Sequence, residues 1–422
     1  MFFQSVKKVK YYKYIIYGKL SLLMKRQLSC VMIIGMKKIT ILFFLILSLS
    51  LAGCKGAQGI RQDQNSEITD TNEPTEDTHE DGNEPSEGRT VIKRVGVAMP
   101  TRTSERWIND GMSIKARLET LGYEVDLQYA DDDIDLQISQ IESMIRNDVS
   151  CLVISSIDST RLVDVLKEAK NNGIAVIAYD RLLMDTDAVS YYASFDNKEV
   201  GTLIGNYIED RMNLEEASRT GKSYTIEFFM GSPDDNNALF LYTGVMDVLK
   251  SYIDNGTLVC RSGKTSFRET CILRWSDTKA EEMCSDLIRE YYRSGDLDIA
   301  CSAFDGFDYG ILRSWQRAGL SMEDLPLITG QDAEKAAVKN IAEGRQAMTI
   351  YKDTRILAAK CVTMVQALLE GGKPEINDTS QYNNNVLTVP SYLCTPVVID
   401  KDNYEDVLIG GGYYTKEQLF AR

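Results

Sequence analysis

The sequence predicts an α/β protein built from two doubly wound parallel sheets. Between residues 94 and 370, short apolar runs alternate with segments that carry apolar residues at helical spacing, which is the pattern of parallel βαβ units. Polar residues cluster where the apolar runs end, and ligands of such sheets bind outside the carboxyl ends of the strands. The part of the chain after Thr90 has roughly 330 residues, more than one core usually holds, so we expect two lobes.

Strands and helices alternate through the first half of this part. The predicted strands cover 94–99, 124–130, 151–155 and 174–178. The predicted helices between them cover 107–121, 134–147 and 159–172. The last of these strands, which follows Gly173, is an unbroken apolar run with β-branched residues, as expected of a parallel strand buried on both faces.

The same alternation continues through the second half. The predicted strands cover 224–230, 258–261, 299–303, 327–330 and 348–351. The predicted helices cover 237–253, 279–293, 306–318, 333–344 and 354–370. Two sheets fit this number of units better than one very large sheet.

The first 53 residues predict an export signal. They contain nine Lys or Arg and no acidic residue, and an apolar run at 39–51 is too short to span a membrane. The run closes with Leu-Ala-Gly-Cys, which resembles a bacterial lipobox, in which the cysteine, here Cys54, is lipidated and becomes the new N-terminus. The alternative is an ordinary signal with Cys54 as a spare thiol. Met36 begins a complete signal of its own, so the start is either Met36 or Met1.

Residues 54–90 predict a lipidated cysteine followed by a disordered acidic tether. The segment has low hydrophobicity, many carboxylates and two prolines, and it buries too little apolar surface to offset the entropy of ordering. As a flexible coil it spans on the order of 30–40 Å. The one histidine of the chain, His79, lies here, so the folded part has no histidine for base catalysis or metal binding.

Composition excludes several classes of function. Without the residues before Cys54 the chain has 38 basic and 62 acidic residues, a charge that argues against a nucleic-acid partner. Apart from Cys30 and Cys54 in the targeting region, seven cysteines remain, without a C-x-x-C pair, so we expect no metal and no cofactor. Cys260 and Cys271 flank a polar loop and either form a disulfide or stay free. The calcium-like spacing that begins at Asp131 has Leu136 where a calcium loop needs glycine.

Polar clusters follow strand after strand at the same topological position. They lie at 103–107, 180–181, 232–237, Asp305, 331–332 and Lys352. Any one of them is explained as a helix N-cap, for which Asp, Asn and Ser are preferred. Six of them together, with basic residues that no cap requires, favour a shared cleft.

These motifs resemble the type I periplasmic sugar-binding proteins of ABC transporters. The matching segments include VGVAMPTRTSERWINDG, GIAVIAYDRL, GSPDDNNALFLYTG, GQDAE and KDTRILA, in order along about 94–420. The resemblance implies the type I periplasmic binding protein fold, with a three-segment hinge near Phe195, Asp353 and Tyr392. The N-terminal lobe would comprise 91–194 and 353–392, and the C-terminal lobe 195–352 and 393–422.

The resemblance also implies a set of sugar-binding residues. They are Arg106, Trp107, Asp180, Arg181, Asn236, Asn237, Trp275, Asp305, Asp332 and Lys352. Which of the two asparagines faces the ligand stays open. Carboxylates accept, basic groups donate and amides do both, which suits sugar hydroxyls, and tryptophan rings cover the C–H face of a sugar. Glu105 and Phe304 depart from multiple-sugar-binding members of the family, which puts the choice of sugar in question.

The function implied is that of a monomeric receptor, not an enzyme. It would bind an aldose of the xylose, glucose, galactose or arabinose class and deliver it to the permease and ATPase subunits of an ABC importer. The lipid on Cys54 would anchor it to the outer face of the cytoplasmic membrane. A sugar sensor that reports to a membrane signalling protein is the alternative, and a carbohydrate-active enzyme with a carboxylate pair is a third reading.

Overall fold

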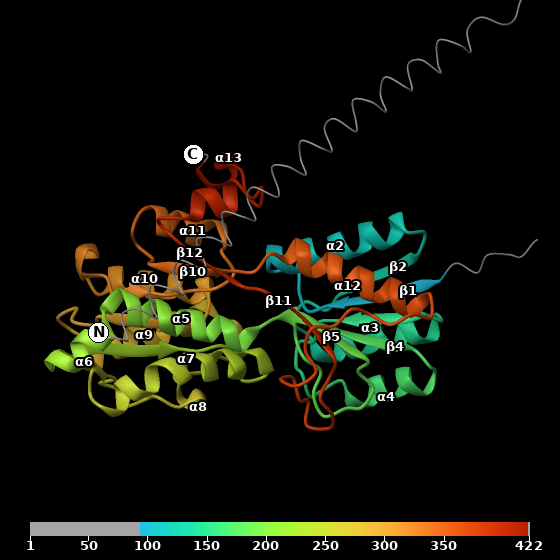
Figure 1. Ribbon diagram of the computed structural model, residues 1–422, viewed down its shortest axis with the longest axis horizontal. Coiled ribbons are helices and arrows are strands. Elements are labelled where there is room, and N and C mark those ends of the chain that lie inside the picture. The colour runs from blue at the N-terminus through green and yellow to red at the C-terminus, as the bar shows by residue number, and fades with distance from the viewer. Residues whose placement is uncertain (1–92, 421–422) are drawn as a thin grey trace, which may run out of the picture. The chain divides into compact units, whose positions relative to one another are not determined.

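The structure, a computed structural model, describes residues 93–420 (Figure 1). The predicted export signal, Cys30, the lipidation site at Cys54, His79 and the tether lie outside the described residues. Among residues 93–420, no helix combines the length and apolar character needed to cross a bilayer.

The first sheet has six strands, all paired in parallel, in the order β11-β5-β4-β3-β1-β2. The strands are β1 (Arg94–Met99), β2 (Glu124–Tyr129), β3 (Cys151–Ile154), β4 (Ala175–Tyr179), β5 (Tyr191–Phe195) and β11 (Ser391–Cys394). Four of them match predicted strands, whereas β5 and β11 were not predicted. The last strand, β11, comes from a segment nearly 200 residues further along the chain than β5.

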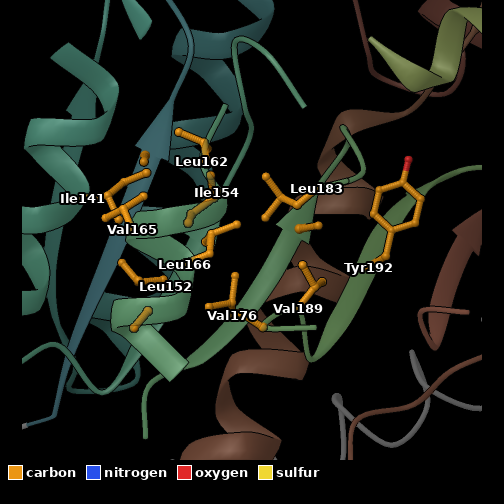
Figure 2. Close-up of a cluster of buried hydrophobic side chains, with 14 of the residues drawn as sticks. Ile141, Leu152, Ile154, Leu162, Val165, Leu166, Val176, Leu183, Val189 and Tyr192 are labelled. Atoms are coloured by element: carbon orange, nitrogen blue, oxygen red, sulfur yellow. The ribbon is translucent and has the colours of Figure 1, made fainter. Parts of the chain in front are cut away.

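Helices cover both faces of this sheet (Figure 1). On one face lie α2 (Glu105–Thr120) and α12 (Thr354–Leu369), and on the other α3 (Ile134–Arg146) and α4 (Val163–Asn171). The strands alternate between the two cores: Leu152 and Ile154 of β3 pack toward α3 and α4, and Val153 packs toward α2 and α12. Figure 2 shows the first of these cores. Burial on both faces explains why these strands are apolar throughout.

The second sheet has four parallel strands in the order β7-β6-β8-β9. They are β6 (Tyr224–Phe229), β7 (Leu258–Val259), β8 (Ile299–Ser302) and β9 (Leu327–Ile328). A separate antiparallel pair is formed by β10 (Met348–Tyr351) and β12 (Val397–Asp400). The prediction of an α/β fold with parallel sheets is confirmed, with this antiparallel pair as an addition.

Two helix pairs sandwich the second sheet. One pair is α5 (Asn197–Met212) with α7 (Asn236–Asp254), and the other is α9 (Asp277–Tyr291) with α10 (Asp305–Arg317). The first pair crosses so closely that a Cβ at Gly201 would lie 1.9 Å from the carbonyl oxygen of Leu241. The remaining helices are α6 (Leu214–Thr220), α8 (Phe267–Thr270), α11 (Lys335–Ala342) and α13 (Lys416–Phe420).

The chain passes three times between the elements around the first sheet and those around the second. These passages run from β5 to α5, from β10 to α12 and from β11 to β12. Phe195, Leu393 and Cys394 pair within the first sheet.

Candidate ligand-binding site

A polar cavity of about 360 Å³ is lined by residues that follow strands of both sheets. From the first sheet come Arg106 and Trp107, in the first turn of α2, and Asp180 and Arg181, directly after β4. From the elements around the second sheet and the β10–β12 pair come Asp235, Asn237, Trp275, Tyr309, Asp332, Glu334 and Lys352. The carboxyl ends of parallel strands thus supply the site, as the topology requires.

The backbone at Asp180 is unusual and firmly held. Its φ of 62° is left-handed, which costs free energy for a residue other than glycine. The carbonyl oxygen of Asp180 accepts hydrogen bonds from the hydroxyls of Tyr192 (2.6 Å) and Ser194 (2.8 Å) and from the amide of Asn237 (2.7 Å). Asn237 belongs to α7, so this bond also ties the second group of elements to the first. These bonds fix the direction in which the Asp180 carboxylate points.

Arg106 is the centre of the charged network. Its Nη2 contacts the Asp180 carboxylate, and its Nη1 lies 3.6 Å from Oδ1 of Asp332. Burial opposes ionisation of Asp180, but nearby Arg106, together with Lys352 and Arg181, holds the pKa of that carboxyl below its usual value. Asp180 is therefore an ionised acceptor at neutral pH.

A second ion pair lies beside the first. Arg181 Nε is 3.3 Å from Oδ2 of Asp235, and its Nη1 donates to the Ser156 carbonyl at 2.9 Å. The indole N–H of Trp275 donates to the same Oδ2 of Asp235 at 3.2 Å. Burial raises the pKa of Asp235, although Arg181 opposes the rise. The indole N–H of Trp275 on Oδ2, the backbone N–H of Asn237 on Oδ1 (3.0 Å) and the charge of Arg181 hold the Asp235 carboxylate in place without filling all its lone pairs.

Lys352 and Asp332 form the third pair. Lys352 Nζ lies 2.7 Å from Asp332 Oδ1, and the lysine side chain is only 5% exposed. Lys352 follows β10, and Asp332 follows Gln331, which bridges to that strand at Ile350. Lys352 and Asp332 therefore sit side by side because their backbone segments pair.

Two tryptophans form apolar walls among these charges. The ring of Trp107 is buried, with the guanidinium carbons of Arg106 and Arg181 4.8 and 5.3 Å from its centroid. Trp275 stacks on Phe307 at 5.8 Å between ring centroids, at an interplanar angle of 16°. Both tryptophans line the cavity, so each serves as wall and as packing. Such faces suit the C–H side of a sugar ring.

The structure brings eight of the ten expected residues to the cavity. Asn236 and Asp305 are outside its lining, and of the two asparagines only Asn237 lines the cavity. Asp305 is fully buried; its Oδ1 accepts from Gln346 at 2.9 Å and its Oδ2 from the backbone N–H of Glu334 at 2.9 Å. In the structure the Asp305 carboxylate therefore serves the interior of the fold and does not line the cavity.

Some lining residues were not predicted. Asp235 and Glu334 lie within motifs already quoted for the resemblance, SPDDNN and GQDAE, but neither was assigned a role. Tyr309 donates to Glu334 at 2.9 Å and lies one turn into α10, where nothing in the sequence distinguishes it. Arg274 has a left-handed φ of 61° and donates to the Ile157 carbonyl at 3.2 Å. Loop conformation of this kind is not encoded in a local pattern.

Asp308 is a buried carboxyl beside Asp305, away from the cavity. Both are fully buried, and neither oxygen of Asp308 has a hydrogen-bond partner among the described residues. Burial, followed by the charge of Asp305, raises the pKa of Asp308 well above its usual value. The folded chain therefore binds more protons than the unfolded chain once the pH exceeds the ordinary aspartate value, and the free energy of unfolding falls as pH rises.

We expect Asp308→Asn to stabilise the protein at neutral and alkaline pH. The amide keeps the shape of the side chain and removes the cost of burying a charge, about 1–3 kcal/mol. Thermal unfolding at pH 5 and pH 8 checks this: the gain in melting temperature should be larger at pH 8. A lower melting temperature for the variant at pH 8 would show that an ionised Asp308 stabilises the fold.

The cysteines are all free thiols in the described part of the chain, so the alternative of a Cys260–Cys271 disulfide is not realised in the structure. Cys260 Sγ instead contacts Glu227, Ser262 and the Lys264 carbonyl.

Within residues 93–420, no group of three His, Cys, Asp or Glu side chains is arranged to hold a metal ion. The run after Asp131 is the start of α3, with the Asp133 side chain as its N-cap.

Comparison with known proteins identifies the family. A periplasmic binding protein domain matches residues 95–373. The chain belongs to the periplasmic binding protein family. It is 49% identical to the multiple sugar-binding periplasmic receptor ChvE of Rhizobium radiobacter, over 77% of this chain and 92% of that protein. It is 33% identical to the D-xylose-binding periplasmic protein of Escherichia coli, over 77% of this chain and 92% of that one.

Solved structures of this family agree with the fold. A solute-binding protein of an ABC transporter from Clostridium phytofermentans, with bound β-D-glucose, is 47% identical, with a TM-score of 0.75 over 78% of this chain and all of that one. A carbohydrate transporter solute-binding protein from Chloroflexus aurantiacus, in complex with D-glucose, is 27% identical, with a TM-score of 0.69 over 78% and 99% of the two chains. The cavity of this periplasmic binding protein is therefore a candidate ligand site by fold as well as by chemistry.

Proposed function

We propose that this chain is the sugar-binding receptor of an ABC importer and that it binds an aldose in the cavity between the two sheets. Its similarity to multiple sugar-binding receptors and to glucose-bound solute-binding proteins supports this function. It is a binding protein and not an enzyme, like the relatives it resembles.

The observation that carries the proposal is the set of three ion pairs, Arg106–Asp180, Arg181–Asp235 and Lys352–Asp332. Each charge is held by its partner and still has free hydrogen-bonding capacity. A sugar hydroxyl donates to the carboxylate and accepts from the cation of one pair, and hydrogen bonds to charged groups are worth about 1.5–3 kcal/mol each. Arg106, Trp107, Asp180, Arg181, Asn237, Trp275, Asp332 and Lys352 are the proposed ligand-binding residues.

We propose hinge closure as the way in which the sugar is enclosed. The lobes would be residues 91–195 with 353–394, and residues 196–352 with 395–422. Two contacts between these groups support the proposal: Lys335 Nζ lies 2.9 Å from Glu105, and the backbone N–H of Ser159 donates to the Asp234 carbonyl at 3.2 Å. Periplasmic binding proteins close by a hinge around their ligands, which excludes water and strengthens the polar contacts.

We further propose that the mature protein is a monomer that is lipid-anchored through Cys54 to the outer face of the cytoplasmic membrane. The Leu-Ala-Gly-Cys motif after a basic and apolar signal supports an anchor. Extracytoplasmic location agrees with the periplasmic relatives. Incorporation of labelled palmitate into the wild-type chain, and its loss in Cys54→Ala, would be the expected result; equal labelling of both would contradict the anchor.

Calorimetric titration with a panel of aldoses tests the central part of the proposal. The panel contains D-glucose, D-galactose, D-xylose, L-arabinose and D-ribose. We expect saturable binding of at least one of them with a Kd in the micromolar range, about −8 kcal/mol. Heats of injection no larger than the heat of dilution for every sugar of the panel would contradict monosaccharide binding.

A deletion of the gene distinguishes import from sensing. Loss of sugar uptake on deletion would support import, whereas loss of a sugar response with intact uptake would support sensing.

A further inference from the structure

Asp110 lies behind the ligand cavity and has no part in its lining. It is on α2 one turn after Arg106, and its side chain is 1% exposed. Oδ2 of Asp110 is 3.8 Å from Nε of Arg106. No described residue makes a hydrogen bond of standard geometry to either carboxylate oxygen, although the hydroxyls of Thr354 and Tyr179 lie near enough to lower its pKa. A buried carboxylate of this kind requires an explanation, since burying a charge without close partners is costly.

The three edges of the Arg106 guanidinium face three different carboxylates. Nη2 contacts Asp180, and Nη1 is 3.6 Å from Asp332, both of which line the cavity. Nε is turned the other way, toward Asp110. Because the guanidinium is a rigid planar fork, holding Nε from behind determines where Nη1 and Nη2 point.

We propose that Asp110 is a positioning residue for sugar binding, which holds Arg106 from behind so that both Nη groups are presented to the ligand. This inference rests on the proposed sugar-binding function. Asp110 acts through Arg106 and does not touch the ligand. Loss of its negative charge leaves the arginine free to reorient and weakens the contacts of both Nη groups.

Protonation of Asp110 adds a pH dependence to this role. Burial raises the pKa of its carboxyl to about 7, although Arg106 opposes the rise. The charged and titratable groups around it are Arg106 on α2, Tyr129 on β2, Tyr179 and Asp180 at the end of β4, Cys361 on α12, and Tyr413. Below pH 7 the carboxyl becomes neutral and its hold on Nε weakens. Sugar affinity should therefore fall on acidification through this range.

The test compares D-glucose binding by the full wild-type chain and by Asp110→Asn, both purified in detergent, between pH 5.5 and 8.5. We expect the wild-type Kd to rise about 5- to 10-fold from pH 8.5 to 5.5, less than the loss of a hydrogen bond to a charged group would cause, because Asp110 acts on the ligand only through Arg106. At every pH, Asp110→Asn should have about the weak affinity that the wild type reaches at pH 5.5, with at most a twofold change across the range, so the two chains should differ most at pH 8.5. Asp235 and Glu334 also line the cavity with raised pKa values, so the difference between the two chains is the decisive quantity.

A second variant separates positioning from general damage. Arg106→Lys keeps the charge but has a single ammonium, which cannot face Asp110 and the cavity together. In this background Asp110→Asn should change the Kd by less than twofold, because the two substitutions remove the same interaction. If Asp110→Asn does not fold, Arg106→Lys alone should show the flattened pH profile. Asp308→Asn is the matched control: it removes a buried carboxyl elsewhere and should keep the wild-type Kd and profile.

The outcomes distinguish this inference from the function on which it rests. A wild-type chain that binds neither D-glucose nor any other aldose overturns the proposed function and the inference with it. A wild-type chain that binds sugar, with an unchanged pH profile in Asp110→Asn, overturns the inference alone. Equal weakening by Asp110→Asn in the wild-type and Arg106→Lys backgrounds also overturns it, because the effect would then not pass through Arg106.

Discussion

Replacing Arg106 by alanine is expected to raise the Kd for D-glucose at least about 100-fold, or to abolish measurable binding. The side chain contacts Asp180 and lies close to Asp332 and Asp110. Its removal deletes the hydrogen bond to Asp180 and the hydrogen bonds that the two Nη groups would donate to the sugar, and hydrogen bonds to charged groups are worth about 1.5–3 kcal/mol each. It also leaves Asp180 buried with its nearest cation gone, which disfavours the ionised acceptor that the ligand needs.

The control for this variant is Arg117→Ala. Arg117 is on the same helix, α2, but it is exposed and outside the cavity, and it donates only to Ser113 at 3.3 Å. We expect the control to bind as the wild type does, as measured by calorimetry. An Arg106→Ala chain that is folded and binds within threefold of the wild type would contradict the assignment of Arg106 to the ligand.

Gly231→Ala is expected to weaken sugar binding about 10- to 100-fold through Trp275. A Cβ at Gly231 would lie 2.1 Å from Cη2 of Trp275, so the ring must move. That movement breaks its hydrogen bond to Asp235 and its stacking on Phe307, and it shifts one wall of the cavity. Insertion of a methyl group into a packed site typically costs about 1–3 kcal/mol.

Intrinsic fluorescence and calorimetry together check this prediction, because the displaced indole should change its emission as the Kd rises. Gly372→Ala is the comparison: the added Cβ would meet only the Ala367 carbonyl, at 3.3 Å, far along the chain from the cavity. It should keep the wild-type Kd. Unchanged binding and emission in Gly231→Ala would show that Trp275 does not form a rigid wall.

Much of the first sheet was predictable from local pattern. β1, β3 and β4 are buried on both faces, so their apolar runs are unbroken and bounded by turn residues. β5 escaped prediction because no helix separates it from β4, and β11 because the segment 370–390 separates it from α12. Ser391 of β11 pairs with Tyr192 of β5, which places β11 at the edge of the first sheet. Between these two strands the chain passes through the elements around the second sheet. Such long-range pairing leaves no periodic signal in the sequence.

The site was predictable where a residue follows a strand, and less so elsewhere. Asp180 and Arg181 follow β4 directly, so topology alone places them at the cavity. Asp305 also follows a strand, but it begins α10, and its side chain turns to Gln346 inside the fold. Asp110 shows the opposite case. Only the three-dimensional structure reveals that a helix residue outside the cavity holds the arginine inside it.

The most direct measurement is the crystal structure of the chain grown with D-glucose. We expect one sugar in the cavity, with its hydroxyls within hydrogen-bond distance of Arg106, Asp180 and Lys352 and with a ring face against Trp107 or Trp275. Asp305 should make no contact with the sugar. Glucose bound at another place, or in this cavity without contact to these three charged residues, would contradict the proposed site.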